Sequence, residues 1–348
     1  NMKTSEIKGG LSFIRHRGIE ICKSRGRCIG VKAQSAVTGE IQEISGNILV
    51  NATGAWADIV ARMAGSEVPM TLSKGSLVIT NHRLTDMVIN RLRPSSDGDI
   101  IVPNEAVCLA GTTSLPVEDP DHIRIEPAEA DVIVTEAGKM IPHFNQTRII
   151  RAFSGVRPLL KSQKLDSREI TRGFQIIDHG NGLYSIVGGK LTTYRLMAEK
   201  MVDTIMEAFN LKRECETAEK PLDGQEELSG YPLSKRLRKM DSIVCECELV
   251  TRDDVERVVN SIGTQHIGDI QHRTRLGMGP CQGGFCTYRA LGIMQEIGRI
   301  SPEESLMILK EFLQRRFRGI RPALWGDQLR EEQLVESIYL GILNMGQQ

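Results

Sequence analysis

Four cysteines in the last third of the chain constrain its fold more than any other feature. They are Cys245, Cys247, Cys281 and Cys286, spaced as Cys-x-Cys and, after a longer gap, Cys-x-x-x-x-Cys. The second pair lies in a glycine-rich loop, residues 277–286, just before a predicted helix. Four thiolates from two short loops can bind an iron–sulfur cluster or a tetrahedral zinc ion. Zinc sites use Cys-x-x-Cys more often than Cys-x-Cys, which favours the cluster and keeps zinc as the alternative.

The composition limits the partners and the location that we expect. The 348 residues suffice for two or three domains, and 44 basic residues balance 44 acidic ones, so nothing indicates nucleic acid as the main partner. The sequence has neither an apolar run of about 18 residues, as a membrane span needs, nor a secretory signal. The other four cysteines lack the spacing of a disulfide framework, which indicates a reducing cytoplasm. They are Cys22, Cys28, Cys108 and Cys215.

A meander of short strands is predicted near the N-terminus, followed by a strand-to-helix turn. The predicted strands are residues 19–22, 28–34 and 41–44. An apolar run then ends in Ala52, Thr53 and Gly54 and leads into a helix of about residues 55–63. The backbone of such a turn can approach an anionic ligand at the helix N-terminus. The segment is therefore either a cofactor-binding turn or an ordinary connection.

The middle of the chain is predicted to form a mostly antiparallel sheet, the lid or floor of a substrate pocket. Strands are predicted at residues 74–80, 99–103 and 107–113, with a helix at 127–140. A later strand, a double glycine and a helix follow at residues 184–195. The predicted core-facing residues of that helix are Tyr194, Ala198, Met201, Ile205 and Phe209.

Three cationic residues, Arg157, Arg172 and Lys190, suggest a phosphate site near the start of this helix. The alternative is that the two arginines are surface ion-pair partners.

The C-terminal part is predicted to be helical after a polar linker. Thr251 is a predicted N-cap of a helix that ends near Val259, and a second helix begins near Cys286. Ser301 opens a capping box with proline in the first turn. The predicted apolar face of that third helix is Leu306, Leu309, Leu313 and Phe317. The basic segment up to Trp325 is either an interface or a solvated surface.

Four separated motifs resemble the FAD-dependent glycerol-3-phosphate dehydrogenases. They are residues 50–58 (Val-Asn-Ala-Thr-Gly-Ala-Trp-Ala-Asp), 74–76 (Lys-Gly-Ser), 154–158 (Ser-Gly-Val-Arg-Pro) and 187–195 (Val-Gly-Gly-Lys-Leu-Thr-Thr-Tyr-Arg). The cysteine module resembles the 2Fe-2S domain of bacterioferritin-associated ferredoxin. The combination, with the tail at residues 316–327, is similar to the flavoprotein component of the anaerobic, three-subunit members of the family.

The resemblance implies an α/β (α+β) architecture of the D-amino-acid-oxidase type. It comprises a partial FAD/NAD(P)-binding, Rossmann-like fold, an antiparallel substrate sheet and a small helical 2Fe-2S domain. The implied domains are residues 1–66, the remainder of the FAD-binding domain; 67–150, the substrate sheet; 151–209, the C-terminal part of the FAD-binding domain; 210–240, a linker; 241–297, the 2Fe-2S domain; and 298–348, a helical extension.

One part of the family pattern is not found in the sequence. The strand–Gly-x-Gly-x-x-Gly–helix that binds the ADP half of FAD is missing, and the chain enters the pattern in the meander. We therefore expect a truncated FAD-binding domain with an exposed sheet edge and apolar surface.

The resemblance also implies an enzyme and its site residues. The reaction would be FAD-dependent oxidation of sn-glycerol 3-phosphate to dihydroxyacetone phosphate, with substrate and catalytic roles for Arg157, Arg172 and Lys190. Lys74 and Ser76 are further candidates for the pocket lining. The implied flavin-binding residues are Ala52, Thr53, Gly54, Gly188, Gly189, Leu191 and Thr192. The four cysteines would hold a 2Fe-2S cluster.

The implied partners are subunits B and C, of which one anchors the complex to the membrane, and quinone further along. The chain itself would be cytoplasmic and peripheral on the inner face of the membrane. Two alternatives remain: a related amine or 2-hydroxy-acid oxidoreductase with the same cluster domain, and a non-catalytic electron-transfer or binding fragment.

Overall fold

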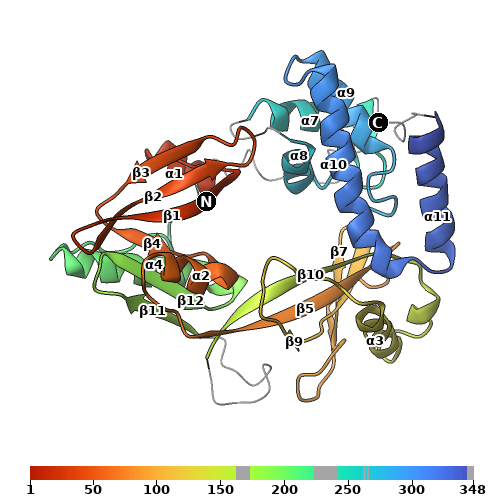
Figure 1. Cartoon of the computed structure of the whole chain (residues 1–348). Coiled ribbons are helices and arrows are strands. Elements are labelled where there is room, and N and C mark those ends of the chain that lie inside the picture. Colours follow the sequence, from red (N-terminus) through yellow and green to blue (C-terminus); the bar gives the residue numbers. More distant parts are fainter. Residues whose placement is uncertain (162–172, 223–241, 262–263, 265, 343–348) are drawn as a thin grey trace. The chain divides into compact units, whose positions relative to one another are not determined.

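The computed structural model describes residues 1–161, 173–222, 242–261, 264 and 266–342. The chain forms two compact units (Figure 1), and each is described by itself. The first unit comprises Asn1–Lys74, Ser114–Ile123 and Gly155–Glu227. The second unit comprises Gly75–Thr113, Arg124–Ser154 and Leu228–Gln348.

An antiparallel meander and a short helix open the first unit. After α1 (Met2–Ile7) come β1 (His16–Ser24), β2 (Arg27–Ser35) and β3 (Ile41–Ser45), paired in chain order. The tight turn between β1 and β2 places Arg25 and Gly26 at positive φ, 49° and 79°, which glycine adopts without steric cost. The three predicted strands are confirmed.

The second sheet of the first unit contains the predicted strand-to-helix turns. Its strand order is β11 (Phe174–Asp178), β12 (Leu183–Gly188) and β4 (Leu49–Asn51). β12 runs parallel to β4 and antiparallel to β11. β4 leads through η1 (Gly54–Trp56) into α2 (Ala57–Met63), and β12 leads through η3 (Leu191–Thr193) into α4 (Tyr194–Ala208). Among the strands described, β4 is an edge strand.

The buried face of α4 differs from the predicted one. Met201 is buried and Ile205 packs beside it, as predicted. Tyr194, Ala198 and Phe209 are exposed, so the prediction was wrong for these three. The face that packs on the sheet is the row Met197, Met201 and Ile205, because α4 contacts Tyr184 and Ile186 of a single strand and needs only a narrow apolar stripe.

The second unit contains the antiparallel sheet predicted for the middle of the chain. Its order is β10 (Ile149–Leu160), β5 (Met70–Thr80), β8 (Val107–Gly111), β7 (Ile100–Asn104) and β6 (Ile89–Asn90), with β9 (Leu115–Pro116) also on β5. The pairs of β5, β6, β7, β8 and β9 are antiparallel. α3 (Pro127–Gly138) packs Ala130, Ile133 and Ala137 into the core of this sheet. Phe144 of η2 (Phe144–Gln146) completes that core.

Two short strands and a set of helices complete the second unit. They are β13 (Ile243–Cys245), β14 (Val250–Thr251), α7 (Arg252–Val259), α8 (Ile267–Thr274), α9 (Cys286–Glu296), α10 (Pro302–Ile320), η5 (Arg321–Ala323), α11 (Asp327–Glu336) and η6 (Ser337–Ile342). The side chains of Thr251 and Ser301 accept the predicted capping bonds from Asp254 N–H and Glu304 N–H. None of the described helices combines the length and the apolar character that a bilayer span requires.

The buried face of α10 also differs from the predicted one. Leu309 is buried, but Leu306 and Phe317 are 48% and 43% exposed, so the prediction was wrong for these two. The inner row instead contains Ser305, Leu309, Phe312, Arg316 and Ile320. Arg316 can occupy it because Glu332 of α11 neutralises its charge, which an apolar-periodicity argument does not detect.

We expect Ser76→Ala to lower the free energy of unfolding of the second unit by about 2 kcal/mol. The Ser76 hydroxyl is fully buried and donates to Glu129 Oε1 at 2.7 Å, and a lost bond to a buried charged group has about this cost. Urea unfolding followed by Trp325 fluorescence in a Trp56→Phe background measures the change. The exposed Ser95→Ala is the control; equal midpoints for the two variants would contradict the prediction.

Candidate functional site

The structure brings the four predicted metal ligands together in the second unit. Cys245 ends β13, Cys247 lies in the turn before β14, Cys281 lies in the glycine-rich loop, and Cys286 is the first residue of α9. The sulfur atoms of Cys247 and Cys281 are 3.7 Å apart. The thiols of Cys245 and Cys286 are hydrogen-bonded to each other. Each of the two motifs therefore contributes one sulfur to each pair.

This pairing fits two metal ions better than one. A zinc ion with four bonds of about 2.3 Å requires all four sulfurs to be about 3.8 Å from one another. In the part of the chain that the structure describes, no three His, Cys, Asp or Glu side chains converge on a single-metal position. The sulfurs instead form two pairs, and a 2Fe-2S cluster takes four cysteine ligands, two on each iron. The donor set thus fits a 2Fe-2S cluster.

Backbone N–H groups stabilise negative charge on one sulfur of each pair. The hydrogen bond from Cys247, followed by the N–H groups of Gly284, Gly283 and Phe285, lowers the pKa of Cys281 to about 6. The hydrogen bond from Cys286 and the N–H groups of Gly277 and Glu248 lower the pKa of Cys245 to about 7. A metal ligand must be a thiolate, and these donors favour that form.

Two positions near the cysteines require glycine. A Cβ atom at Gly279 would lie 2.3 Å from Cys247 Cβ. One at Gly283, where φ is 83°, would lie 2.7 Å from the Phe312 ring. The loop that the sequence marked as glycine-rich therefore owes its close packing against Cys247 and α10 to these two residues.

The predicted flavin-binding residues gather at one edge of the first unit's parallel strand pair. Ala52, Thr53 and Gly54 follow β4, and Gly188 ends β12 with Gly189, Leu191 and Thr192 directly after it. The two segments meet because β4 and β12 are parallel and pair Asn51 with Ser185. Ligands of open α/β sheets bind at the carboxyl ends of parallel strands. Leu191 is 89% exposed there, so this edge is open to a ligand.

A buried hydrogen-bond network holds this edge, and the sequence reasoning missed it. Asn51 Nδ2 donates to Ala57 O at 2.8 Å and to Ser185 Oγ at 3.1 Å. Its Oδ1 accepts from the Thr53 hydroxyl at 2.6 Å, and Ser185 Oγ also contacts His179 Nε2 at 2.9 Å. An asparagine immediately before a strand-to-helix turn is the sequence signal that could have indicated it.

The predicted substrate residues are spread over several elements. Arg157 is half-buried on β10, and Lys190 is the exposed N-cap of η3; both belong to the first unit. Lys74 is buried at the end of the first unit's segment of β5, and Ser76 belongs to the second unit. Arg172 lies outside the described residues.

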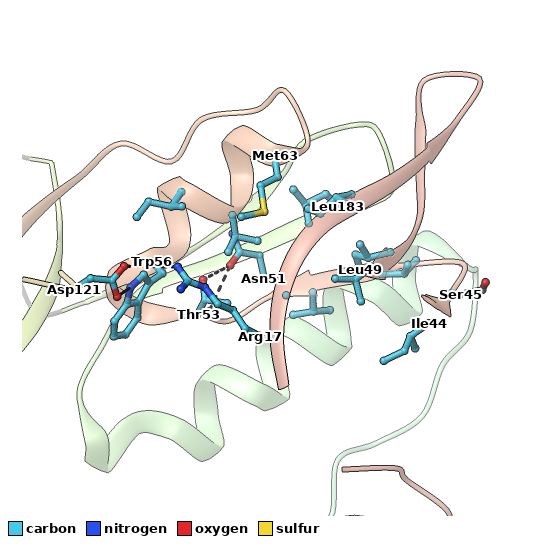
Figure 2. Close-up of a pocket in the computed structure, with 18 residues that line it drawn as sticks. Arg17, Ile44, Ser45, Leu49, Asn51, Thr53, Trp56, Met63, Asp121 and Leu183 are labelled. Carbon is cyan, nitrogen blue, oxygen red and sulfur yellow. Dashed lines mark hydrogen bonds and ion pairs between the residues drawn. The ribbon is translucent and has the colours of Figure 1, made fainter. Parts of the chain in front are cut away.

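A cavity of about 690 Å³ in the first unit lies beside the turn after β4 (Figure 2). Its walls are mostly apolar side chains of the meander, β4 and α2, such as Ile44, Leu49 and Met63. At its polar end Trp56 Nε1 donates to Asp121 Oδ1 at 2.9 Å, and Thr53 belongs to the lining as well. The cavity therefore places apolar surface along β4, as expected for the edge of this sheet.

Comparisons with known proteins agree with these sites. The model of the FAD dependent oxidoreductase family matches residues 7–195, and that of the BFD-like 2Fe-2S binding domain matches residues 243–296. The A-chain component of the anaerobic glycerol-3-phosphate dehydrogenase of Escherichia coli K12 is 35% identical over 99% of this chain and 70% of its own length. The A1 component of the Haloferax volcanii enzyme is 37% identical over 88% of this chain and 57% of its own length.

A solved structure shows the same fold. The glycerol-3-phosphate dehydrogenase from Bacillus halodurans, complexed with FAD, superposes with a TM-score of 0.64 at 21% identity. The match covers 92% of this chain and 72% of the other.

We expect the anaerobically purified chain to contain about two iron ions and two acid-labile sulfides, as one 2Fe-2S cluster requires. Cys247→Ser should abolish or strongly reduce this content, because it removes one sulfur of a pair. Cys215→Ser, at an exposed cysteine outside the centre, should leave it unchanged. Metal analysis and the visible spectrum measure both; one zinc per chain without iron would exclude the cluster.

We also expect Asn51→Ala to destabilise the first unit by about 2–3 kcal/mol, since it leaves several buried polar groups without their partner. Urea unfolding followed by Trp56 fluorescence in a Trp325→Phe background reports on this unit. The exposed amide variant Gln175→Ala on β11 is the matched control. Similar stabilities of the two variants would show that the network does not hold the strand ends.

Proposed function

Since the chain belongs to the FAD dependent oxidoreductases and, among them, to the A components of anaerobic glycerol-3-phosphate dehydrogenases, we propose that it oxidises sn-glycerol 3-phosphate to dihydroxyacetone phosphate. The observation that carries this proposal is the presence of both redox sites in one chain. The first unit has the flavin-type strand edge, and the second unit has four cysteines in the paired arrangement of a 2Fe-2S centre.

The reaction removes a hydride from C2 of the substrate and a proton from its hydroxyl group. Bound FAD supplies the two-electron acceptor, and the 2Fe-2S cluster supplies a one-electron carrier for onward transfer. The chain itself must bind the phosphate group, hold C2 against the flavin and exclude competing reactions.

We assign phosphate binding to Arg157, Arg172 and Lys190. A phosphate dianion is bound best by fixed cations, and the planar guanidinium group can donate two parallel hydrogen bonds to it. The half-buried position of Arg157 on a strand supports this role because it limits the motion of the side chain. The exposed ammonium of Lys190 lies at the start of a helical segment, between Gly189 and Leu191.

We assign flavin binding to the residues at the ends of β4 and β12. The Thr193 hydroxyl accepts from Lys190 N–H and donates to Lys190 O, both at 2.9 Å, which fixes the backbone where the helical segment begins. The positive end of the helix dipole there favours a negatively charged group. Gly188, Gly189, Leu191 and Thr192 are therefore suited to stabilise the negative charge that a flavin ring acquires on reduction.

Partner subunits are the proposed destination of the electrons. Curated relatives from Escherichia coli and Haemophilus influenzae are named as components of a multi-subunit dehydrogenase, so the chain is one component of a larger complex. We propose that subunits B and C accept the electrons and pass them to quinone, with one of them holding this chain at the inner face of the cell membrane.

The first experiment is an anaerobic assay with an artificial electron acceptor on the purified chain, with flavin and iron quantified in parallel. Oxidation of glycerol 3-phosphate but not of glycerol supports the proposal. Oxidation of amines or 2-hydroxy acids without phosphate dependence identifies a related oxidoreductase. Iron without flavin and without turnover identifies an electron-transfer module.

Arg157→Ala should raise KM for glycerol 3-phosphate about 10- to 100-fold, because losing one charged hydrogen bond costs about 1.5–3 kcal/mol. Arg157→Lys should lie between the two, since it keeps the charge but not the fork. The control is Arg213→Ala at an exposed position in the same unit. Steady-state kinetics at fixed iron and flavin content provide the test, and an unchanged KM would remove Arg157 from the site.

A further inference from the structure

Two side chains from beyond the matched 2Fe-2S domain contact the loop that carries Cys281. The domain match ends at residue 296, whereas Arg316 belongs to α10 and Tyr339 to η6. Arg316 Nε donates to Gln282 O at 2.9 Å, and the Tyr339 hydroxyl donates to Gly284 O at 2.9 Å. Both residues are only 3% exposed. The C-terminal helices therefore reach the metal centre through two buried hydrogen bonds to its backbone.

These two carbonyls belong to peptide groups whose N–H groups face a sulfur atom. The carbonyl of Gln282 shares a planar peptide group with the N–H of Gly283, and the carbonyl of Gly284 shares one with the N–H of Phe285. In a trans peptide group the N–H and the C=O point in opposite directions. The N–H groups of Gly283 and Phe285 both donate to the Cys281 sulfur. Each peptide group is thus held at its carbonyl by a C-terminal side chain and at its N–H by the sulfur.

The third peptide group of the loop is held from within the domain. Its carbonyl, Gly283 O, accepts from the Thr287 hydroxyl at 2.8 Å, and its N–H, that of Gly284, also donates to Cys281. All three N–H donors of Cys281 therefore have their carbonyl oxygens fixed by a side chain, and two of these three side chains come from the C-terminal helices.

Arg316 is itself fixed by a buried ion pair. Its Nη1 contacts both carboxylate oxygens of Glu332 at 2.7 and 2.6 Å, and its Nη2 contacts Cys281 O at 3.4 Å. The pair satisfies the buried guanidinium, which would be costly to bury alone. Burial also raises the pKa of the Tyr339 phenol, so its hydroxyl remains a donor at neutral pH.

We propose that Arg316 and Tyr339 are positioning residues of the metal centre, which direct the N–H groups of Gly283 and Phe285 at the Cys281 sulfur and thereby raise the reduction potential of the bound cluster. Hydrogen bonds to a ligand sulfur stabilise the more negative, reduced form of an iron–sulfur cluster. The effect on potential rests on the 2Fe-2S centre of the proposed function, whereas the positioning of the loop is a property of the chain alone.

The decisive variant is Tyr339→Phe, which removes one hydroxyl group and keeps the buried ring. We expect unchanged iron and sulfide content and a lower midpoint potential in a redox titration followed by EPR. The one-electron equilibrium constant should change at least about threefold, which is about 30 mV at 59 mV per tenfold. Tyr288→Phe, on the partly exposed face of α9, is the matched control and should show no shift. An unchanged potential in Tyr339→Phe would overturn the proposal.

A second measurement tests the positioning without the cluster. In metal-free protein, amide hydrogen exchange of the loop peptide at residues 277–286 should be faster in Tyr339→Phe and in Arg316→Lys than in Tyr288→Phe. Arg316→Lys keeps the charge, but its single ammonium cannot contact Glu332 and Gln282 in the same fork geometry. Unchanged exchange in both variants would show that the loop is held without these side chains. A chain that carries zinc would refute the proposed cluster and leave this second result interpretable.

Discussion

A peptide group can stabilise a negative ligand only if its N–H points at the ligand and its carbonyl is satisfied elsewhere. Both candidate sites of this chain meet that constraint. At the cysteine centre the carbonyls of Gln282, Gly283 and Gly284 accept bonds from Arg316, Thr287 and Tyr339, and the following N–H groups donate to Cys281. At the strand edge of the first unit, the Thr193 hydroxyl fixes both backbone groups of Lys190. In each case side chains away from the ligand determine which way the backbone presents its dipoles.

The two sites suit different ligands because they are built differently. The cysteine centre is mostly enclosed, with Cys245 and Cys286 each 1% exposed, so a bound cluster is shielded from water and its potential depends on nearby dipoles. The strand edge is open, with Leu191 almost fully exposed and an apolar cavity beside Thr53. A large planar cofactor needs such an accessible edge. The chain thus combines an open site for two-electron chemistry with a closed site for one-electron transfer.

The sequence predicted the elements well and the packing of their faces less well. Local signals such as the Thr251 and Ser301 caps, the double glycine before Lys190 and the cysteine spacing identified the elements and the metal ligands. Apolar periodicity misplaced part of the faces of α4 and α10, because exposed apolar residues such as Phe317 are common and a buried Arg316 is not apolar. The pairing of the cysteines depends on how two distant loops meet. Asn51 was missed since its partners, Ala57 and Ser185, are recognisable only when β4 and β12 lie side by side.

The C-terminal tail gains a physical role from these contacts. One end of α10 contacts the cysteine loop through Arg316, and three residues later Gly319 lies against β10, where a Cβ atom would be 2.5 Å from the Arg151 guanidinium. Ala323, in the turn after α10, belongs to the core of the antiparallel sheet. Arg148 of the segment before β10 also contacts Gln328 of α11 at 3.1 Å. The segment at residues 316–327 is therefore the physical link between the metal centre and the sheet within the second unit. A substitution that shifts α10 against the sheet must also move the side chain that holds the peptide groups around Cys281.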